Sequence, residues 1–159
     1  MKSTRTFPCS LADRSRWAAL RLLACLLLCC VLPVAEAAAE LVVIANPKSG
    51  VEKLSHDDVV NIFLGRFRQL PSGVSALPAD LPPAQPEKAV FYRLLVNKEL
   101  AEINSYWARL VFSGRTSPPR QVGSSDDLLK WVAGNPGGIG YLERSQVDAR
   151  VRVVFELAP

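Results

Sequence analysis

Residues 54–65 read LSHDDVVNIFLG and residues 135–141 read NPGGIGY, and these two stretches decide the fold. In the first stretch, Ser55 and Asp58 have the spacing of a capping box, and apolar residues follow at helical spacing up to a closing glycine. In the second stretch, a glycine-rich turn leads into the apolar run Gly138–Leu142. The sequence therefore predicts a helix capped by Ser55 and a short late strand.

The rest of the chain after residue 40 alternates between strand and helix patterns. Leu41–Ala45 is a continuous apolar run, which predicts a strand buried on both faces. A weaker strand is expected at Val74–Leu77, and residues 151–157 predict a final, half-exposed strand with Val154 on its exposed face. Three further helices are expected, with these apolar residues on their buried faces: Val90, Phe91, Leu94 and Leu95 after Pro86; Leu100, Ile103, Trp107, Leu110 and Val111 before Gly114; and Leu128, Leu129 and Val132 between Ser124 and Gly134. Alternating strands and helices indicate an α/β fold.

The two quoted stretches resemble the second lobe of the phosphate ABC transporter substrate-binding protein family, whose helix ends IFLG and whose late PGAIGY turn leads into a strand. The resemblance extends from Leu41 to about Phe155. It implies an α/β fold equivalent to one lobe of a type 2 periplasmic binding protein, with a small mixed sheet flanked by helices. Family members have two lobes that close on the anion, and this chain has room for one. It is therefore identified as a single-lobe member.

The resemblance also places a candidate ligand site in the loop before the second predicted helix. Where the family carries Arg-x-Asp-Gly-Ser-Gly-Thr, whose N–H groups and hydroxyls donate to the oxyanion, residues 80–87 read DLPPAQPE. The family's Ser-Gly-Thr falls on residues 85–87, which include a proline without an N–H and a glutamate. Asp80 matches the family's aspartate if the loop is two residues longer, and Gln85 and Lys88 lie at the mouth of the same helix. Asp80, Gln85 and Lys88 are thus the candidate ligand-binding residues.

We expect an exported solute-binding-like protein that resembles the phosphate-binding component of an ABC importer and binds phosphate, or another small anion, weakly or not at all. The alternative is a periplasmic protein-interaction or sensor-accessory module, in which a rigid, extended Leu81–Pro86 loop contacts a protein partner. The partners to consider are a small anion in the first case, and an ABC permease or a periplasmic protein in the second.

Residues 1–39 are expected to be a secretory signal peptide. Five basic residues precede or interrupt an apolar run, and A-x-A sites follow it, with cleavage after Ala37 or Ala39. The run of about 11 apolar residues is short for a bilayer span. An uncleaved anchor and a lipoprotein attached through Cys25 are the alternatives. Residues 40–159 would then form one periplasmic-binding-protein-like domain, periplasmic or secreted, that meets the membrane only through the signal peptide before cleavage.

Composition narrows the function classes. All four cysteines lie in residues 1–39, so no disulfide framework or thiolate metal site is expected in the mature chain. Residues 40–159 hold 14 Lys and Arg against 13 Asp and Glu, a formal charge of +1, which argues against a nucleic-acid partner. His56 is the only histidine, so a zinc site would need three carboxylates. No metal and no cofactor is expected.

Two short motifs contain the residue types of enzyme sites. Ser55, His56 and Asp57 have the residue types of a hydrolase triad, but adjacent helical residues point about 100° apart, and a helix cap explains them as well. Asn46–Gly50 reads NPKSG and resembles the nucleotide loop of diacylglycerol kinase-like lipid kinases, although that family's second signature, G-G-D-G-T, is absent. A strand-to-loop turn is the favoured interpretation. The chain is therefore not expected to be an enzyme.

Overall fold

The structure is a computed structural model that describes residues 40–157, so the predicted signal peptide lies outside the described residues. The described elements are β1 (Leu41–Ala45), the 3-10 helix η1 (Pro47–Ser49), α2 (His56–Phe63), β2 (Leu77–Asp80), α3 (Pro86–Val96), α4 (Leu100–Phe112), β3 (Arg120–Gln121), α5 (Ser125–Gly134), β4 (Gly138–Glu143), the 3-10 helix η2 (Arg144–Gln146) and β5 (Arg152–Glu156). Within this range no helix has the length and apolar character needed to cross a bilayer.

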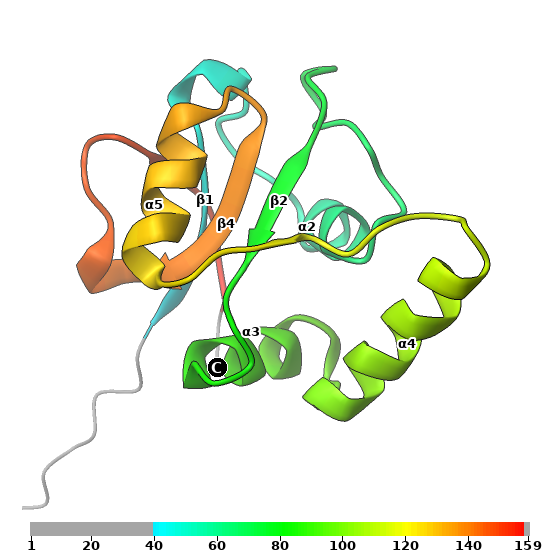
Figure 1. The fold of residues 1–159 in the computed structure, drawn as a ribbon. Coiled ribbons are helices and arrows are strands. Elements are labelled where there is room, and N and C mark those ends of the chain that lie inside the picture. Colours follow the sequence, from blue (N-terminus) through cyan, green and yellow to red (C-terminus); the bar gives the residue numbers. More distant parts are fainter. Residues whose placement is uncertain (1–39, 158–159) are drawn as a thin grey trace, which may run out of the picture. The chain divides into compact units, whose positions relative to one another are not determined.

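The strands form one five-stranded sheet in the order β3-β2-β4-β1-β5. β2 pairs in parallel with both β3 and β4, whereas β1 pairs antiparallel with both β4 and β5. Figure 1 shows β1, β4 and β2 side by side at the centre of the domain. The mixed sheet expected from the resemblance is confirmed. Of its parallel strands, β2 leads into α3 and β3 leads into α5.

The glycines of the late motif let α5 pack directly on β4. Successive residues of a strand point to opposite faces, and Gly138 and Gly140 share the α5 face. A Cβ atom at Gly140 would lie 2.4 Å from Leu128 Cδ2, and one at Gly138 would lie 2.8 Å from the backbone of Val132. Figure 1 shows α5 in front of the sheet and α2 behind it. The repeated glycine of GGIGY therefore has a packing explanation.

Tyr141, between the α5-facing positions of β4, points to the opposite face and joins the aromatic core there. Its ring stacks on Phe91 of α3 with ring centroids 3.8 Å apart and an interplanar angle of 6°. Phe63 of α2 meets Phe91 edge-on at 4.8 Å. These three rings are fully buried. They fix α2 and α3 against the sheet and orient the hydroxyl of Tyr141.

The local signals at the starts of the helices are confirmed. Ser55 is the N-cap of α2 and forms a capping box with Asp58. Pro86 occupies the first turn of α3, where its missing N–H has no helical partner to lose. Ser124 caps α5 by accepting a hydrogen bond from the N–H of Asp127, at 3.1 Å.

The predicted strand at Val74–Leu77 begins too early, because β2 spans Leu77–Asp80. A proline counts against a central strand, since it cannot donate to the ladder. Here Leu77 donates its N–H to Gly137 beside β4, at 2.8 Å, so the nitrogen of Pro78 faces the other side. On that side, pairing with β3 begins only at Ala79. No ladder hydrogen bond is lost, and the strand continues through Pro78 to Asp80.

The last strand also departs from its predicted pattern. Val43 pairs with Phe155 and Ile44 with Val153, which leaves Val154 as the extra residue of a β-bulge. Val154 is buried rather than exposed, and its carbonyl oxygen accepts a hydrogen bond from the N–H of Leu54 at 2.9 Å. The bulge breaks the predicted alternation at Val154, while Arg152 and Glu156 are exposed as expected.

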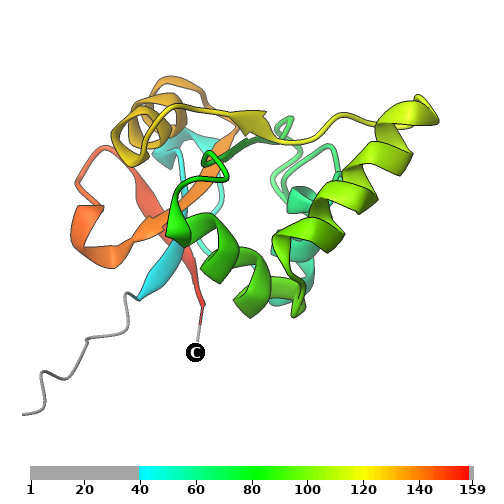
Figure 2. The ribbon, with the colours of Figure 1, turned by 60° about the horizontal axis from the view of Figure 1, so that its bottom comes forward.

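Some predicted helix faces are less buried than their apolar residues indicate. α4 lies beside α3 at the edge of the domain (Figures 1 and 2), and it buries only Ile103 and Trp107. Val111 was expected to be buried but is 53% exposed, and the next residue, Phe112, is 97% exposed. Val90 on α3 is also exposed. Periodicity cannot distinguish a core-facing stripe from an apolar surface that no element of the domain covers.

Candidate functional site at the start of helix α3

The candidate site lies at the carboxyl ends of two adjacent parallel strands. β2 and β3 pair with Ala79 opposite Arg120 and Asp80 opposite Gln121, and the chain then leads into α3 and α5 respectively. The Ser125 hydroxyl at the start of α5 lies 3.4 Å from the side-chain oxygen of Gln85, the N-cap residue of α3. Open α/β sheets bind ligands at this kind of edge, where helix N-termini direct N–H groups at anions.

Asp80 and Lys88 form a buried ion pair at this edge. Lys88 Nζ lies 2.9 Å from Asp80 Oδ2, and the two residues are only 8% and 5% exposed. The Tyr92 hydroxyl donates to the same oxygen at 3.0 Å, and the Tyr141 hydroxyl donates to Oδ1 at 2.5 Å. Three donors thus surround one carboxylate. The positive charge of Lys88 is neutralised inside the protein and is not directed at solvent.

The two tyrosines act as permanent donors to Asp80. Burial, reinforced by the negative charge and hydrogen bond of Asp80, raises the pKa of Tyr92 well above its ordinary value. The same causes raise the pKa of Tyr141, and the N–H of Leu81, which donates to its hydroxyl oxygen at 3.3 Å, opposes them only partly. Both hydroxyls therefore remain protonated over the physiological pH range.

The first turn of α3 offers few donors to an external anion. The Gln85 side chain makes no capping hydrogen bond, and Pro86 has no N–H. Glu87 places a carboxylate in the first turn, and its Oε2 atom is buried without a hydrogen-bond partner among the described residues. A resident negative charge at the positive end of a helix opposes the binding of a second anion there.

The structure joins the side chains of Asp80 and Lys88, while the side chain of Gln85 takes no part in this ion pair and lies beside Ser125. A ligand-binding role for these three residues stays a prediction. The sequence reasoning missed Tyr92 and Tyr141 as partners of Asp80. The helical i, i+4 spacing of Lys88 and Tyr92 was the available signal, but it becomes useful only once β2 is known to end at Asp80.

The loop between β2 and α3 is folded back and is not extended as expected for Leu81–Pro86. The N–H of Gln85 donates to the carbonyl oxygen of Pro82 at 3.0 Å, which closes a turn, and Leu81 is fully buried. Two prolines in succession restrict φ but do not prevent a turn that begins at the first of them.

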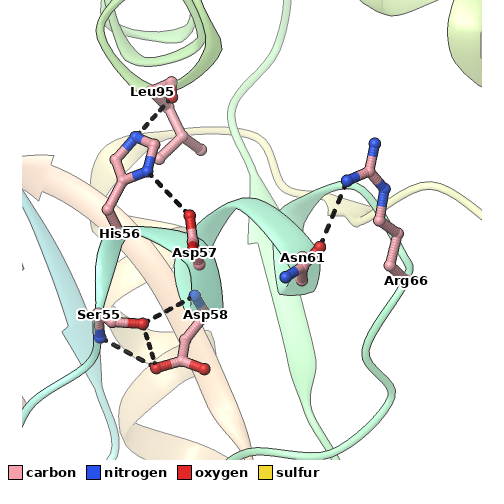
Figure 3. A network of polar contacts seen from close by, with 7 residues as sticks. All are labelled: Ser55, His56, Asp57, Asp58, Asn61, Arg66 and Leu95. Atoms are coloured by element: carbon pink, nitrogen blue, oxygen red, sulfur yellow. Dashed lines mark hydrogen bonds and ion pairs between the residues drawn. The ribbon is translucent and has the colours of Figure 1, made fainter.

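Ser55 and His56 do not form a catalytic pair (Figure 3). The Ser55 hydroxyl lies 2.6 Å from Asp58 Oδ2 and accepts from the N–H of Asp58 at 3.1 Å. His56 Nε2 lies 2.8 Å from the carbonyl oxygen of Leu95, and because a carbonyl can only accept, Nε2 carries the proton. Its Nδ1 lies 3.6 Å from Asp57 Oδ1. The helix-cap interpretation is confirmed.

The NPKSG motif forms the turn η1, and its asparagine connects this turn to α5. Asn46 Nδ2 donates to the carbonyl oxygens of Val132 and Ala133 at 2.9 and 2.8 Å, and its Oδ1 accepts from the N–H of Lys48 at 2.8 Å. Gly50 ends the turn with a φ of 72°. The side chain of Asn46 is therefore occupied by structural hydrogen bonds.

Within residues 40–157, no three His, Cys, Asp or Glu side chains gather in a way that could hold a metal ion.

The fold is similar to one lobe of solved phosphate-binding proteins. A protein from Clostridium perfringens, assigned as a phosphate ABC transporter substrate-binding protein and solved with phosphate bound, superposes with a TM-score of 0.57 and 18% identity over 72% of this chain and 44% of that one. An ABC-type phosphate transport receptor from Vibrio cholerae gives a TM-score of 0.58 and 14% identity over 72% of this chain and 45% of that one. This chain therefore spans less than half the length of either protein. The expected one-lobe α/β fold is confirmed.

The similarity is detected at the level of structure. No protein-family model and no curated protein sequence matches the chain. Identities of 18% and 14% establish a shared fold and leave the ligand open.

Proposed function

We propose that this chain is an exported solute-binding-like protein, built on one lobe of the phosphate-importer type, that binds phosphate weakly or not at all. One observation carries the proposal: Lys88, the cation at the mouth of α3, forms an ion pair at 2.9 Å with the buried carboxylate of Asp80. A lysine that already has a buried partner can attract an external anion only by giving up that partner. Pro86 and Glu87 weaken the same site further.

The open face of a single lobe also works against tight binding. In a two-lobed binding protein the anion is enclosed and desolvated between the lobes, which strengthens each hydrogen bond to it. Here, a phosphate ion at the start of α3 would retain much of its hydration shell and would compete with Glu87. A dissociation constant in the millimolar range or weaker is therefore expected.

The binding part of the proposal is tested by isothermal titration of the purified protein with inorganic phosphate, at protein concentrations high enough to detect a millimolar constant. No heat beyond dilution, or weak heat that sulfate reproduces, is the expected result. Saturable binding at one site per chain with a micromolar constant would contradict it. In that case Gln85→Ala and Lys88→Gln would establish whether the start of α3 holds the anion.

Export is tested separately. The full chain with a C-terminal tag, produced in a Gram-negative bacterium, should appear in the periplasmic fraction. Intact-mass measurement should place its new N-terminus at Ala38 or Glu40, and a variant lacking residues 2–39 should remain in the cytoplasm. An unprocessed chain in the membrane fraction would favour the anchor instead, and a lipid-modified cysteine would favour the lipoprotein.

The second candidate is a periplasmic protein-interaction or sensor-accessory module. It is favoured by the self-sufficiency of the Asp80 cluster, in which Lys88, Tyr92 and Tyr141 use their polar groups on one internal carboxylate. A domain whose buried polar groups satisfy one another can use the same fold as a docking platform. This candidate predicts no phosphate binding at all.

A further inference from the structure

A groove with a different chemistry lies beside the first residues of β2, Leu77 and Pro78. Its volume is about 340 Å³, and it is lined by the start of β2, the end of α2 and the segment that leads into β3. The lining is mainly apolar and proline-rich; the residues that matter for binding are Phe67, Leu77 and Trp131 with two arginines, Arg68 and Arg120. No carboxylate is among the described residues that line the groove.

Arg120 is held in a fixed position at this groove. Its guanidinium carbon lies 4.4 Å from the centroid of the Trp131 ring, which is a cation–π contact. The Trp131 ring is itself fixed, because Nε1 donates to the carbonyl oxygen of Leu77 at 3.4 Å. A guanidinium stacked on a ring leaves its edge N–H groups free, and these are the groups that bind a carboxylate in a bidentate manner.

A second guanidinium belongs to the same surface. Arg68 Nη2 donates to the carbonyl oxygen of Arg115 at 3.0 Å, which orients the side chain and leaves other donors available. Within residues 40–157, neither Arg68, Arg115 nor Arg120 forms an ion pair, although six other Lys and Arg side chains do so with Asp or Glu. Uncompensated positive charges close together favour an acidic partner.

Exposed apolar side chains accompany these charges. Phe67 is 48% exposed and Leu77 is 40% exposed, and both line the groove. Figure 1 shows the chain from α4 to β3 crossing in front of α2, and Thr116 on this chain lies close to Gly65. Arginine and aromatic side chains around a hydrophobic centre are enriched at protein-binding surfaces.

We propose that this groove docks an acidic segment of a partner protein, with carboxylates paired to Arg68 and Arg120 and an apolar side chain against Phe67. Charge complementarity identifies the occupant, because the groove has cations and apolar surface but no acid. A bare small anion would use the arginines and leave the apolar surface uncovered. The proposal does not depend on phosphate binding, since neither Asp80 nor Lys88 lines the groove. Arg120 pairs with Ala79, so it lies on the face of the sheet opposite to that of Asp80.

The test uses the purified protein and two fluorescein-labelled peptides of equal length, one alternating glutamate with leucine and one alternating lysine with leucine. Fluorescence anisotropy should show binding of the acidic peptide only, and added salt should weaken it. Arg120→Glu should lower its affinity about tenfold or more, whereas Arg152→Glu should change it less than about twofold. Arg152 is a matched control because it is exposed, lies on the opposite edge strand β5 and carries the same charge.

Two further measurements distinguish a loss of binding from a loss of folding. Arg68→Gln, at an exposed position outside the sheet, should also weaken binding. In a ¹⁵N–¹H spectrum, the indole N–H resonance of Trp131 should move on addition of the acidic peptide, and that of the buried Trp107 should not. The proposal is overturned by any of four results: equal binding of both peptides, equal loss in Arg152→Glu, no acidic-peptide binding at about 1 mM, or complete displacement by millimolar phosphate, which would indicate a small-anion site.

Discussion

Two cations beside β2 have opposite environments. At the mouth of α3, Lys88 is 8% exposed and is paired with Asp80. On β3, opposite Ala79, Arg120 is exposed, stacked on Trp131 and without a carboxylate partner among the described residues. The first position, where the sequence resemblance placed a ligand site, is chemically closed, and the groove at Arg120 is open. Similarity of fold therefore locates the framework, while the side chains decide where an external anion can bind.

The closed site is destabilised most severely by a substitution at Asp80. Asp80→Ala would leave the ammonium group of Lys88 buried without a counter-charge and would remove the acceptor of two tyrosine hydroxyls. Removal of one member of a buried ion pair costs about 3–5 kcal/mol, and we expect a loss of this size in the free energy of unfolding measured with urea.

The matched control removes both charges at once. Asp80→Asn combined with Lys88→Met leaves no buried charge and nearly conserves volume, so it should recover most of the stability lost in Asp80→Ala. If Asp80→Ala cost less than about 1 kcal/mol, the pair would have to be solvated, and Lys88 would again be a candidate anion ligand.

The second prediction concerns alkaline pH and the same cluster. The pKa values of Tyr92 and Tyr141 are raised in the folded state, so above about pH 10 the unfolded chain has released protons that the folded chain still holds. The unfolded state then binds fewer protons, and the free energy of unfolding must fall as pH rises. Each tyrosine contributes a slope of about 1.4 kcal/mol per pH unit in that range, measurable by urea unfolding between about pH 8 and pH 11.

Phenylalanine substitutions separate this effect from general alkaline denaturation. Tyr92→Phe and Tyr141→Phe should each be less stable at neutral pH, because one donor to Asp80 is lost. Each should also show a shallower decline above about pH 10 than the parent protein. If the stability of both variants declined with pH as steeply as that of the parent protein, the hydroxyls would have to ionise in the folded state. That result is incompatible with a closed cluster.

The framework around both sites could be predicted because its signals are local. A capping serine at Ser55, a first-turn proline at Pro86 and the glycines at Gly138 and Gly140 act through their own backbone or their immediate neighbours. Such signals remain valid whatever the tertiary context is. The resemblance then supplied the one-lobe α/β architecture with a mixed sheet, which no single residue encodes.

The closed cluster could not be predicted because it depends on where β2 ends. Sequence reasoning placed Lys88 at the helix mouth, matched Asp80 to an aspartate of the resembled family, and interpreted both as ligand contacts. Pro78 made a strand at Leu77–Asp80 look unfavourable, and the compensating detail is that its nitrogen faces the side where β3 has not yet begun. Without that register, neither the burial of Asp80 nor the convergence of Tyr141 on it follows from the sequence.

The smallest expected effect sharpens the comparison from the open groove. Arg68→Ala and Arg120→Ala should each change the free energy of unfolding by less than about 1 kcal/mol, because exposed side chains without an ion pair contribute little to stability. The cation–π contact of Arg120 adds about 0.5–1 kcal/mol at most at an exposed site, and solvation of the freed surface offsets part of it. Urea unfolding beside Asp80→Ala provides the measurement. A loss near 3 kcal/mol in either arginine variant would mean that these cations hold the fold together. The distinction between a lysine with a structural role and two arginines that remain available to a partner would then be wrong.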